Sequence, residues 1–476
     1  MPPVLPALIA LALSAGDAIG PATPVPAEPS PAAPAPAPAA AAPAPTLAEG
    51  TRRYRVERIV LRGLVKAQEG EVRKYILVAE GDVLDSERVL LSRLRLLQLG
   101  WFSAVETRVE RGSERGQVIL VFEVTERNTL IITDVVIGGT APQPIYGGLG
   151  LSQQNFLGRG LGLSGGLVYG GSPSGRPDDP ARFSARLGFF APDVAVAGLP
   201  RLVFGVSGLF LRGEELACGD ADCAAYRGRY GQAPRTRYQR AGGDLTLGFR
   251  PGPFERVLAT YRYERVQATA LEASLAPPGA SVPILLGDSN LAALAGTYEI
   301  DTRDDFFYPK EGLRALAQVT FGSALFGGDY EYSRYLLQLE TAYGLFGAPI
   351  RFQGVLGAVQ GGAPFFERYY PADYSYFAIG PALGRAMELN FSTDSRYDAF
   401  LAAGGLEWGK PLFGKHGILE RGYLAVGVRG VWSSATLGGS RTPYSKVPVS
   451  ADLALRLDTP VGTFNLSLGY LLDIFL

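Results

Sequence analysis

From residue 130 onward the chain alternates apolar and polar positions with a period of two. In the stretch 244–250 the residues at 245, 247 and 249 are apolar, whereas those at 244, 246 and 250 are polar or charged. Such alternation predicts β-strands with one face in an apolar environment. The polar face keeps its charges in strand after strand, in more strands than a soluble sandwich needs. We therefore expect an antiparallel transmembrane β-barrel with a lipid-facing outside and a polar lumen.

The alternating stretches give fifteen expected strands. They are 130–139, 146–155, 161–169, 181–190, 202–212, 238–250, 257–266, 292–301, 313–322, 332–343, 350–359, 398–408, 423–432, 450–458 and 462–472. Single-chain bacterial barrels normally hold an even number of strands, so we expect 15 to 16 strands over residues 129–476.

Two segments without this pattern open the chain. Residues 1–20 contain an apolar stretch, followed by small residues that offer a cleavage site after Ala15 or Ala18, and this predicts a secretory signal peptide. The amino terminus is its only positive charge, because no Lys or Arg precedes Arg52. Residues 21–50 are mostly Pro and Ala, a composition that predicts a disordered, semi-stiff linker.

Residues 51–128 predict a small α+β domain with the order β-α-α-β-β. The expected elements are a strand at 54–61, helices at 68–77 and 84–99, and strands at 104–111 and 118–126. In the second helix Leu90, Leu91, Leu94 and Leu97 form an apolar stripe that we expect to pack on the sheet, and Asp85 or Ser86 can cap its start.

Composition removes several function classes. The 45 basic and 46 acidic residues nearly cancel, which gives no indication of nucleic-acid binding. Beyond residue 20 no apolar run reaches the roughly 18 residues that a membrane-spanning helix needs. Cys218 and Cys223, the only cysteines, predict a small disulfide in a polar loop, with free thiols as the alternative. With one histidine and two cysteines, we expect no metal site and no cofactor.

Two short motifs typical of enzymes are better explained as strand glycines. Residues 160–165 fit G-x-G-x-x-G and residues 162–166 fit G-x-S-x-G. No helix is expected after the first motif to bind a pyrophosphate, and a hydrolase triad would have to use His416, the only histidine. We therefore expect no enzymatic activity.

Several stretches carry a family resemblance. In residues 51–128 they are Leu99–Val105 and Phe122–Glu126, which resemble a POTRA domain. In the barrel they are Asn155–Gly160, Asp301–Asp304 with Tyr308–Gly312, and Leu455–Gly462 continuing to Leu468–Tyr470. Together they resemble the BamA/TamA superfamily of outer-membrane assembly and translocation barrels, with a single POTRA domain. The hairpin residues that match the family are Asp301, Arg303, Asp304, Pro309 and Gly312.

The resemblance implies an outer-membrane protein with its POTRA domain in the periplasm. It implies an assembly, insertion or translocation factor whose POTRA domain captures an extended client by β-augmentation and whose barrel seam or lumen inserts or passes it. The expected partners are unfolded outer-membrane or secreted clients, the lipid bilayer and periplasmic accessory proteins. The alternatives are a two-partner-secretion translocator and a passive outer-membrane pore.

The resemblance also implies a lock inside the lumen. In the family a loop with an Arg-Gly-aromatic tip folds into the barrel, and its arginine pairs with an acidic wall residue. The matching stretch here holds Gly380, Pro381 and Arg385, followed by alanine and methionine in place of glycine and the aromatic residue. Residues 426–432, where the acidic residue is expected, contain Arg429 instead. Glu407 and Asp452 are the candidate partners of Arg385, and the alternative is an arginine solvated in the lumen.

The last strand raises the question of barrel closure. In the family a further strand follows the hairpin that here ends at residue 470, and residues 471–476 are too few to turn and cross again. We expect the strand 462–472 to close the barrel against 130–139, with sparse hydrogen bonding that makes this seam the client gate. Ordinary closure by sixteen strands is the alternative. The expected lipid-facing residues of the strand 462–472 are Phe464, Leu466, Leu468 and Tyr470.

Overall fold

A computed structural model describes fourteen segments of the chain. They are residues 54–138, 145–171, 181–194, 201–216, 235–271, 282–305, 309–345, 348–374, 387–389, 397–414, 419, 421–437 and 449–459 with 462–472. The expected signal peptide and linker lie outside these residues, as do Cys218 and Cys223. Among the described residues, no helix has both the length and the apolar character needed to cross a bilayer.

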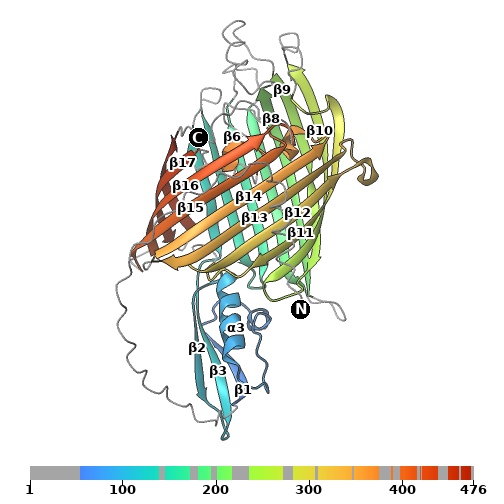
Figure 1. Cartoon of the computed structure of the whole chain (residues 1–476). Helices are drawn as coiled ribbons and strands as arrows, with labels where there is room; N and C mark the ends of the chain where they lie inside the picture. The colour runs from blue at the N-terminus through green and yellow to red at the C-terminus, as the bar shows by residue number, and fades with distance from the viewer. Residues whose placement is uncertain are drawn as a thin grey trace, which may run out of the picture. The chain divides into compact units, whose positions relative to one another are not determined.

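The amino-terminal part of the described chain is the predicted β-α-α-β-β domain (Figure 1). Its elements are β1 (Arg55–Arg62), α2 (Glu69–Arg73), α3 (Ser86–Gln98), β2 (Phe102–Arg111) and β3 (Gln117–Glu126). The sheet has the order β1-β3-β2, in which β3 is parallel to β1 and antiparallel to β2. The central strand therefore has neighbours on both sides, and β1 and β2 form the two edges.

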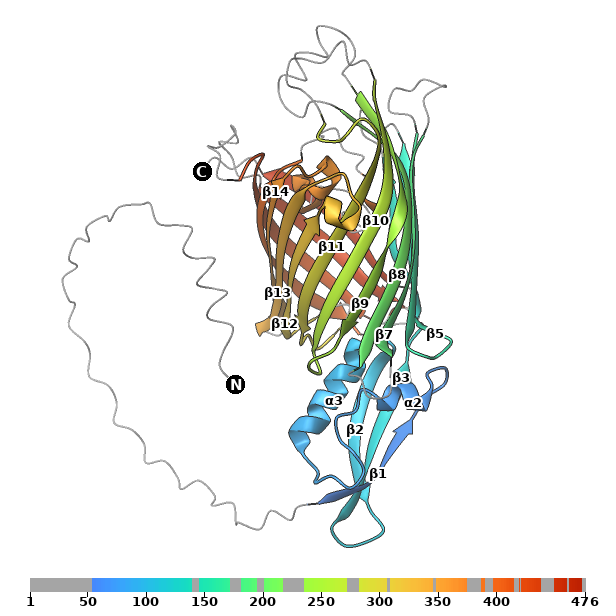
Figure 2. The same ribbon diagram turned by 90° about the vertical axis from the view of Figure 1, so that its right-hand side faces the viewer.

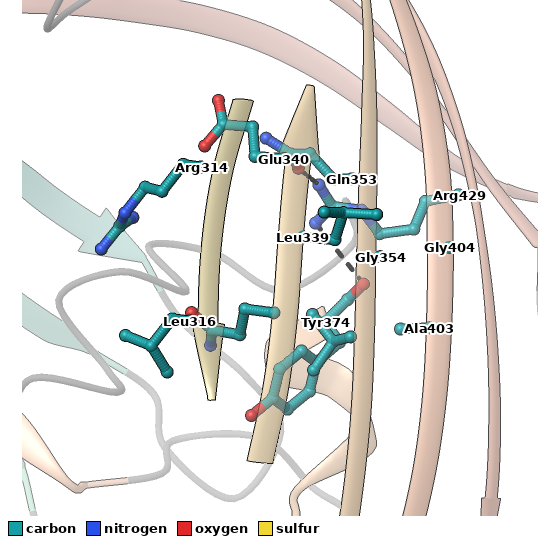
Figure 3. A pocket seen from close by; sticks show the side chains of 12 residues that line it. Arg314, Leu316, Leu339, Glu340, Gln353, Gly354, Tyr374, Ala403, Gly404 and Arg429 are labelled. Atoms are coloured by element: carbon teal, nitrogen blue, oxygen red, sulfur yellow. Dashed lines mark hydrogen bonds between the residues drawn. The ribbon is translucent and has the colours of Figure 1, made fainter. Parts of the chain in front are cut away.

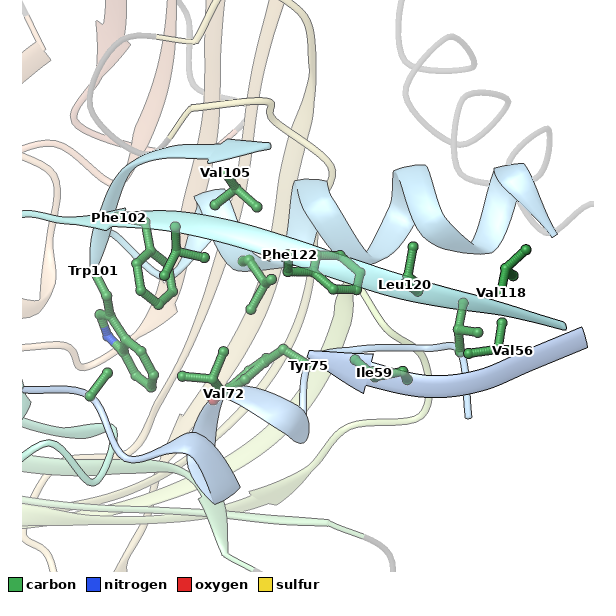
Figure 4. Packing of buried hydrophobic residues seen from close by; sticks show 14 residues of the cluster. Val56, Ile59, Val72, Tyr75, Trp101, Phe102, Val105, Val118, Leu120 and Phe122 are labelled. Atoms are coloured by element: carbon green, nitrogen blue, oxygen red, sulfur yellow. The ribbon is translucent and has the colours of Figure 1, made fainter. Parts of the chain in front are cut away.

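Packing of α3 on this sheet corrects one sequence prediction. The core contains Phe122 and Trp101 (Figure 4). Leu96 is fully buried in this core, and Leu97 packs against it. Leu90, expected on the buried stripe, is instead 51% exposed. Leucines lie around much of this helix, so spacing alone placed Leu97 correctly but also put Leu90 on the buried side and left out Leu96.

A substitution in this core provides the first test. Leu96→Asp is expected to destabilise the domain by several kcal/mol, because it places an unpaired charge among apolar side chains. Leu90→Asp, on the exposed face of the same helix, should stay within about 0.5 kcal/mol of wild type. Limited proteolysis of the membrane-embedded protein would measure both. Equal protease resistance of the two variants would refute the core assignment.

The remaining strands form one 15-stranded antiparallel sheet, which curves into a barrel (Figures 1 and 2). They are β4 (Leu130–Gly138), β5 (Tyr146–Phe156), β6 (Leu161–Gly170), β7 (Arg182–Val194), β8 (Leu202–Leu216), β9 (Arg235–Phe249), β10 (Glu255–Leu271), β11 (Gly287–Asp301), β12 (Gly312–Gly322), β13 (Tyr332–Leu345), β14 (Ala348–Gly361), β15 (Phe400–Phe413), β16 (Arg421–Ser434), β17 (Val449–Thr459) and β18 (Gly462–Leu472). Each strand pairs with the next along the chain, so the predicted fold class is confirmed.

Side-chain burial follows the predicted alternation. On β10, Tyr261 and Tyr263 are 38% and 44% exposed, whereas Glu264 between successive outward positions is 1% exposed. On β9, Leu245 and Leu247 are likewise exposed. Apolar and aromatic side chains therefore face outward, and charged side chains face the lumen, as a membrane barrel requires.

A segment between β14 and β15 folds back into the barrel. It contains the short helices η3 (Phe365–Glu367) and η4 (Pro371–Tyr374), and residues 387–389 and 397–399 follow them. Phe365 packs edge-on against Tyr238 of the barrel wall at a centroid distance of 5.0 Å. Tyr369 belongs to a second buried cluster with wall residues of β13 and β14. The described parts of this in-folded segment are thus packed against the wall.

Candidate functional site

A buried ion network joins the in-folded segment to the lumen wall. Glu388, on the in-folded segment, accepts hydrogen bonds from Arg240 (2.6 Å) and Arg262 (2.7 Å) at one carboxylate oxygen. Its other oxygen accepts from Arg186 at 3.3 Å. These arginines come from β9, β10 and β7, so one glutamate connects three strands of the wall. We call this arrangement the Glu388 network.

Further carboxylates hold two of these arginines in place. Arg240 donates to Glu264 at 2.9 Å, and Arg262 donates to Glu367 of η3 at 2.9 Å. The guanidinium of Arg240 also lies over the ring of Phe366, 3.8 Å from its centre. Because the side chain of Arg240 is 0% exposed, its charge depends on these neighbours for compensation.

Backbone geometry and packing position Glu388 for this role. Its φ is 55°, a left-handed conformation that a side chain other than glycine rarely adopts. The preceding residue, Met387, accepts a hydrogen bond at its carbonyl from Ser184 of β7 at 2.6 Å. Its side chain is buried against Tyr146 and Val168. The segment is therefore fixed to the wall at the residue that precedes the carboxylate.

The residues predicted for the lumen lock are only partly described. Arg385, Gly380 and Pro381 lie outside the described residues, so pairing of Arg385 stays a prediction. Glu407, one predicted partner, faces the lumen from β15.

Glu407 already has cationic partners on the wall. It contacts Arg351 of β14 and Arg456 of β17. Asp452, the other predicted partner of Arg385, is buried on β17.

A polar cavity of about 190 Å³ adjoins the in-folded segment (Figure 3). Arg429 of β16 lies at its edge, where it donates to the side chain of Gln353 and, at 3.5 Å, to the carbonyl of Tyr374 on η4. The wall position where the family resemblance implied an acid therefore holds a cation that binds the in-folded segment. Together with Glu388, this gives a lock with the acid on the segment and the arginines on the wall.

The first family-like motif forms the turn between β5 and β6, against the small domain. Asn155 accepts a hydrogen bond from the amide of Gly160 at 2.8 Å, which closes the turn. The carbonyl of Gly158 accepts from the amide of Gln68 at 3.0 Å, and Trp101 donates to the carbonyl of Gln154 at 3.1 Å. The turn therefore docks directly onto the domain core.

Gly158 is the most constrained point of this docking. Its φ is +71°, and an added Cβ would lie 2.1 Å from the carbonyl oxygen of Lys66. Gly158→Ala is expected to weaken the docking, and the domain should become more accessible to protease. Gly296→Ala on β11 is the control, because no atom lies within 4 Å of its added Cβ. Equal digestion of the two variants would contradict the docking role of Gly158.

The second motif forms the hairpin between β11 and β12. Arg303 is held by Asp301 at 2.8 Å, and Asp304 accepts from the amide of Lys310 at 2.8 Å. Gly312 has a φ of +104°, which only glycine adopts readily. Pro309 is buried in the same hairpin.

This hairpin also contacts the small domain. Gln98, at the end of α3, donates to the carbonyl of Arg303 at 2.6 Å and to that of Asp301 at 3.2 Å. The motif therefore closes the hairpin and also binds the POTRA-like domain, because its backbone carbonyls accept hydrogen bonds from the side chain of Gln98.

The third motif places Asp458 at the end of β17, beside the start of β4. Its carboxylate accepts from Arg127, which follows β3 and leads into β4, at 3.1 Å and from Arg421 of β16 at 2.7 Å. The side chains of Arg127 and Asp458 are only 3% and 4% exposed. A buried ion pair thus links one end of the sheet to the other, and we call it the seam tie.

The two terminal strands of the sheet run in the same direction. The sheet begins with β4 and ends with β18, and every neighbouring pair between them is antiparallel. With 15 strands, the first and the last must then be parallel. Some of their Cα atoms lie within 8 Å of one another, yet no backbone pairing joins these two described strands. The side chains of β18, including those at 464, 466, 468 and 470, are not described.

Both the barrel and the amino-terminal domain match known protein families. Residues 155–473 match the Omp85 superfamily domain, a match that spans more than half of the chain. This chain belongs to the Omp85 superfamily. Residues 54–127 match a POTRA family described as a surface antigen variable number repeat. The chain is therefore an outer-membrane β-barrel protein with a periplasmic POTRA domain, and members of this superfamily are not enzymes.

Two solved structures of CdiB have a similar fold, and a structure of BamA also aligns with most of this chain. CdiB from Escherichia coli is 12% identical, with 89% of this chain and 75% of that chain covered and a TM-score of 0.53. CdiB from Acinetobacter baumannii is 12% identical, with coverage of 88% and 71% and a TM-score of 0.50. BamA from Haemophilus ducreyi lacking POTRA domains 1–3 is 19% identical, with coverage of 90% and 82% and a TM-score of 0.46.

Proposed function

We propose that this Omp85 protein inserts client β-strands into the outer membrane at the seam between β4 and β18. The observation that carries the proposal is the pair of adjacent, parallel terminal strands, between whose described residues no backbone ladder forms. Backbone groups left unpaired in hydrocarbon cost several kcal/mol each, so such a seam favours the addition of a strand. One extended strand running antiparallel to both neighbours would complete an all-antiparallel barrel.

The POTRA domain supplies an edge for capturing an extended client. The outer side of β1 is partly occupied, because Val56 donates to the carbonyl of Asp82 at 2.9 Å and Leu84 donates to that of Tyr54 at 2.8 Å. The opposite edge is β2, most of whose side chains are exposed or half-buried. Backbone hydrogen bonding to such an edge gives affinity without demanding one client sequence. We assign client capture to β2.

The in-folded segment in the lumen favours insertion of clients at the seam over passage of clients through the lumen. The in-folded segment is packed against Tyr238 and is bonded through Glu388 to three arginines of the wall. A client passing through the lumen would have to break this buried network. A client adding at the seam would leave it intact.

Depletion of the protein in its native host tests the proposed function. Insertion at the seam predicts that integral outer-membrane proteins disappear from the membrane before secreted proteins disappear from the medium. Expression of the wild-type chain should restore them. Expression of a chain with several POTRA β2 residues replaced by proline should not, because proline removes backbone donors from the capturing edge.

Two outcomes would overturn the proposal. Selective loss of secreted proteins, with the outer membrane unchanged, would indicate a two-partner-secretion-type translocator. Unchanged amounts of both the integral outer-membrane proteins and the secreted proteins would indicate a passive pore.

A further inference from the structure

Three arginines gather where the POTRA domain meets two periplasmic turns of the barrel. Arg95 lies on α3, Arg201 immediately precedes β8, and Arg250 immediately follows β9. The amide of Arg250 donates to the carbonyl of Arg201 at 3.3 Å, which joins the two turns. The guanidinium of Arg201 donates to the carbonyl of Lys74 at 3.0 Å, which joins them to the POTRA domain. We call these residues the junction cluster.

The junction cluster has more positive than negative charge. Its carboxylate is Asp193, 2.5 Å from the guanidinium of Arg201 and 3% exposed. Arg95 is 8% exposed, and its Nε atom has no hydrogen-bond partner within the described residues. The Nε atom of Arg250 is likewise buried and without a partner in the described chain. Among the described residues of the cluster, three guanidinium groups therefore lie near one carboxylate, which pairs with Arg201.

Tyr75 lies within the same cluster and adds a hydroxyl group. The guanidinium of Arg95 lies 5.5 Å from the centre of its ring. Burial, followed by the charge of Asp193, raises the pKa of Tyr75 to about 12, so its hydroxyl stays neutral at physiological pH. Burial, followed by the charges of Arg250 and Arg201, lowers the pKa of Arg95 to about 10. These mutual effects place the groups within electrostatic range of one another.

The position of the cluster points to the membrane interface. Leu247 and Phe249 face outward from β9 and are 54% and 39% exposed. Arg250 follows directly, so it lies one residue beyond the lipid-facing part of the strand at its periplasmic end. Lipid phosphate groups lie at this depth, next to the hydrocarbon.

We propose that the junction cluster binds the phosphate group of an anionic phospholipid from the periplasmic leaflet. Arg201 and Arg250 contact the phosphate from the membrane side, and Arg95 supplies a buried positive charge behind them. The planar fork of arginine matches phosphate oxygens, and an anion would compensate the excess positive charge. The bound lipid would then connect the POTRA domain, the barrel and the membrane. This inference stands independently of the proposed function at the seam.

The test measures lipid binding by the full-length chain in detergent micelles. Phosphatidylglycerol, phosphatidylcholine and inorganic phosphate are titrated separately, and bound molecules are counted by native mass spectrometry. The variant carries Arg201→Gln and Arg250→Gln. The control is Arg265→Gln, an exposed arginine paired with Asp288 on the barrel wall. Retention of the folded band on unheated gels confirms that each variant is folded.

Wild type and the control are expected to retain phosphatidylglycerol in preference to phosphatidylcholine. The double variant should bind phosphatidylglycerol about tenfold more weakly, equivalent to about 1.4 kcal/mol. If the double variant fails to fold, Arg250→Lys replaces it, and loss of the fork should still weaken binding. Equal retention by the folded variant and wild type would overturn the site. Binding of inorganic phosphate without phosphatidylglycerol would overturn the lipid assignment.

Discussion

Glu388→Gln is expected to release the in-folded segment from the lumen wall. The change keeps the shape of the side chain but removes the charge that Arg186, Arg240 and Arg262 share. Removing one partner of a buried ion pair typically costs about 3–5 kcal/mol, because the remaining charge is left without compensation. Arg240, with no exposed side-chain surface, is the group most affected.

Thermal stability and ion conductance both report release of the segment. The temperature at which the folded band disappears from gels should fall, and ion conductance in planar bilayers should rise as the lumen becomes less filled. Asp288→Asn is the matched control, because it neutralises a carboxylate whose side chain is 62% exposed. If Glu388→Gln and the control keep wild-type stability and conductance, the Glu388 network does not hold the segment in place.

Asp458→Ala is expected to loosen the seam. Its carboxylate joins Arg127, in the connection between β3 and β4, to Arg421 of β16, and the side chains of Arg127 and Asp458 are almost fully buried. Loss of the carboxylate removes the buried ion pair between Arg127 and β17, with an expected cost again of about 3–5 kcal/mol. The folded band should therefore melt at a lower temperature.

A double-mutant cycle separates the seam tie from general destabilisation. Arg127→Ala and Asp458→Ala are made singly and together, and their melting temperatures are compared. If the two residues act as a pair, the double variant loses less stability than the sum of the single losses. Strict additivity would show that no coupling crosses the seam.

The barrel could be predicted from sequence because each strand alternates apolar residues that face lipid with polar residues that face the lumen. Alternation in 244–250 or 259–264 is a local property, and the structure places a strand at each of the fifteen expected stretches. The order of the sheet follows, since each strand pairs with its neighbour along the chain, and the fifteen strands among the described residues lie within the expected 15 to 16.

Helix α3 shows where local pattern was insufficient. Its leucines cover two overlapping stripes, one through Leu90 and Leu94 and the other through Leu96, which is fully buried. Helical spacing is satisfied by either, and only the orientation of the helix on the sheet decides between them. That orientation depends on contacts with the neighbouring strands, which the helix sequence does not contain.

The Glu388 network could not be predicted as a site. Alternation did place Arg262 and Glu264 on the lumen face, but Glu388 lies more than a hundred residues from them and reaches them only through the folded chain. The sequence did give a signal, because the wall stretch where an acid was expected contains Arg429. An arginine on the wall was a reason to look for an acid on the in-folded segment.

Disulfide trapping of β4 to β18 tests the proposed insertion at the seam most directly. Cysteine pairs are placed between residues 131–137 and 464–470, with Cys218 and Cys223 replaced by serine. Because the two strands are parallel, the cross-linking partner of each β4 cysteine should move toward higher numbers on β18 as the β4 position moves toward higher numbers. Cross-linked protein should stop inserting clients in membranes, and reduction should restore insertion. Full client insertion by the cross-linked protein would contradict the account, as would partners that move in the opposite direction.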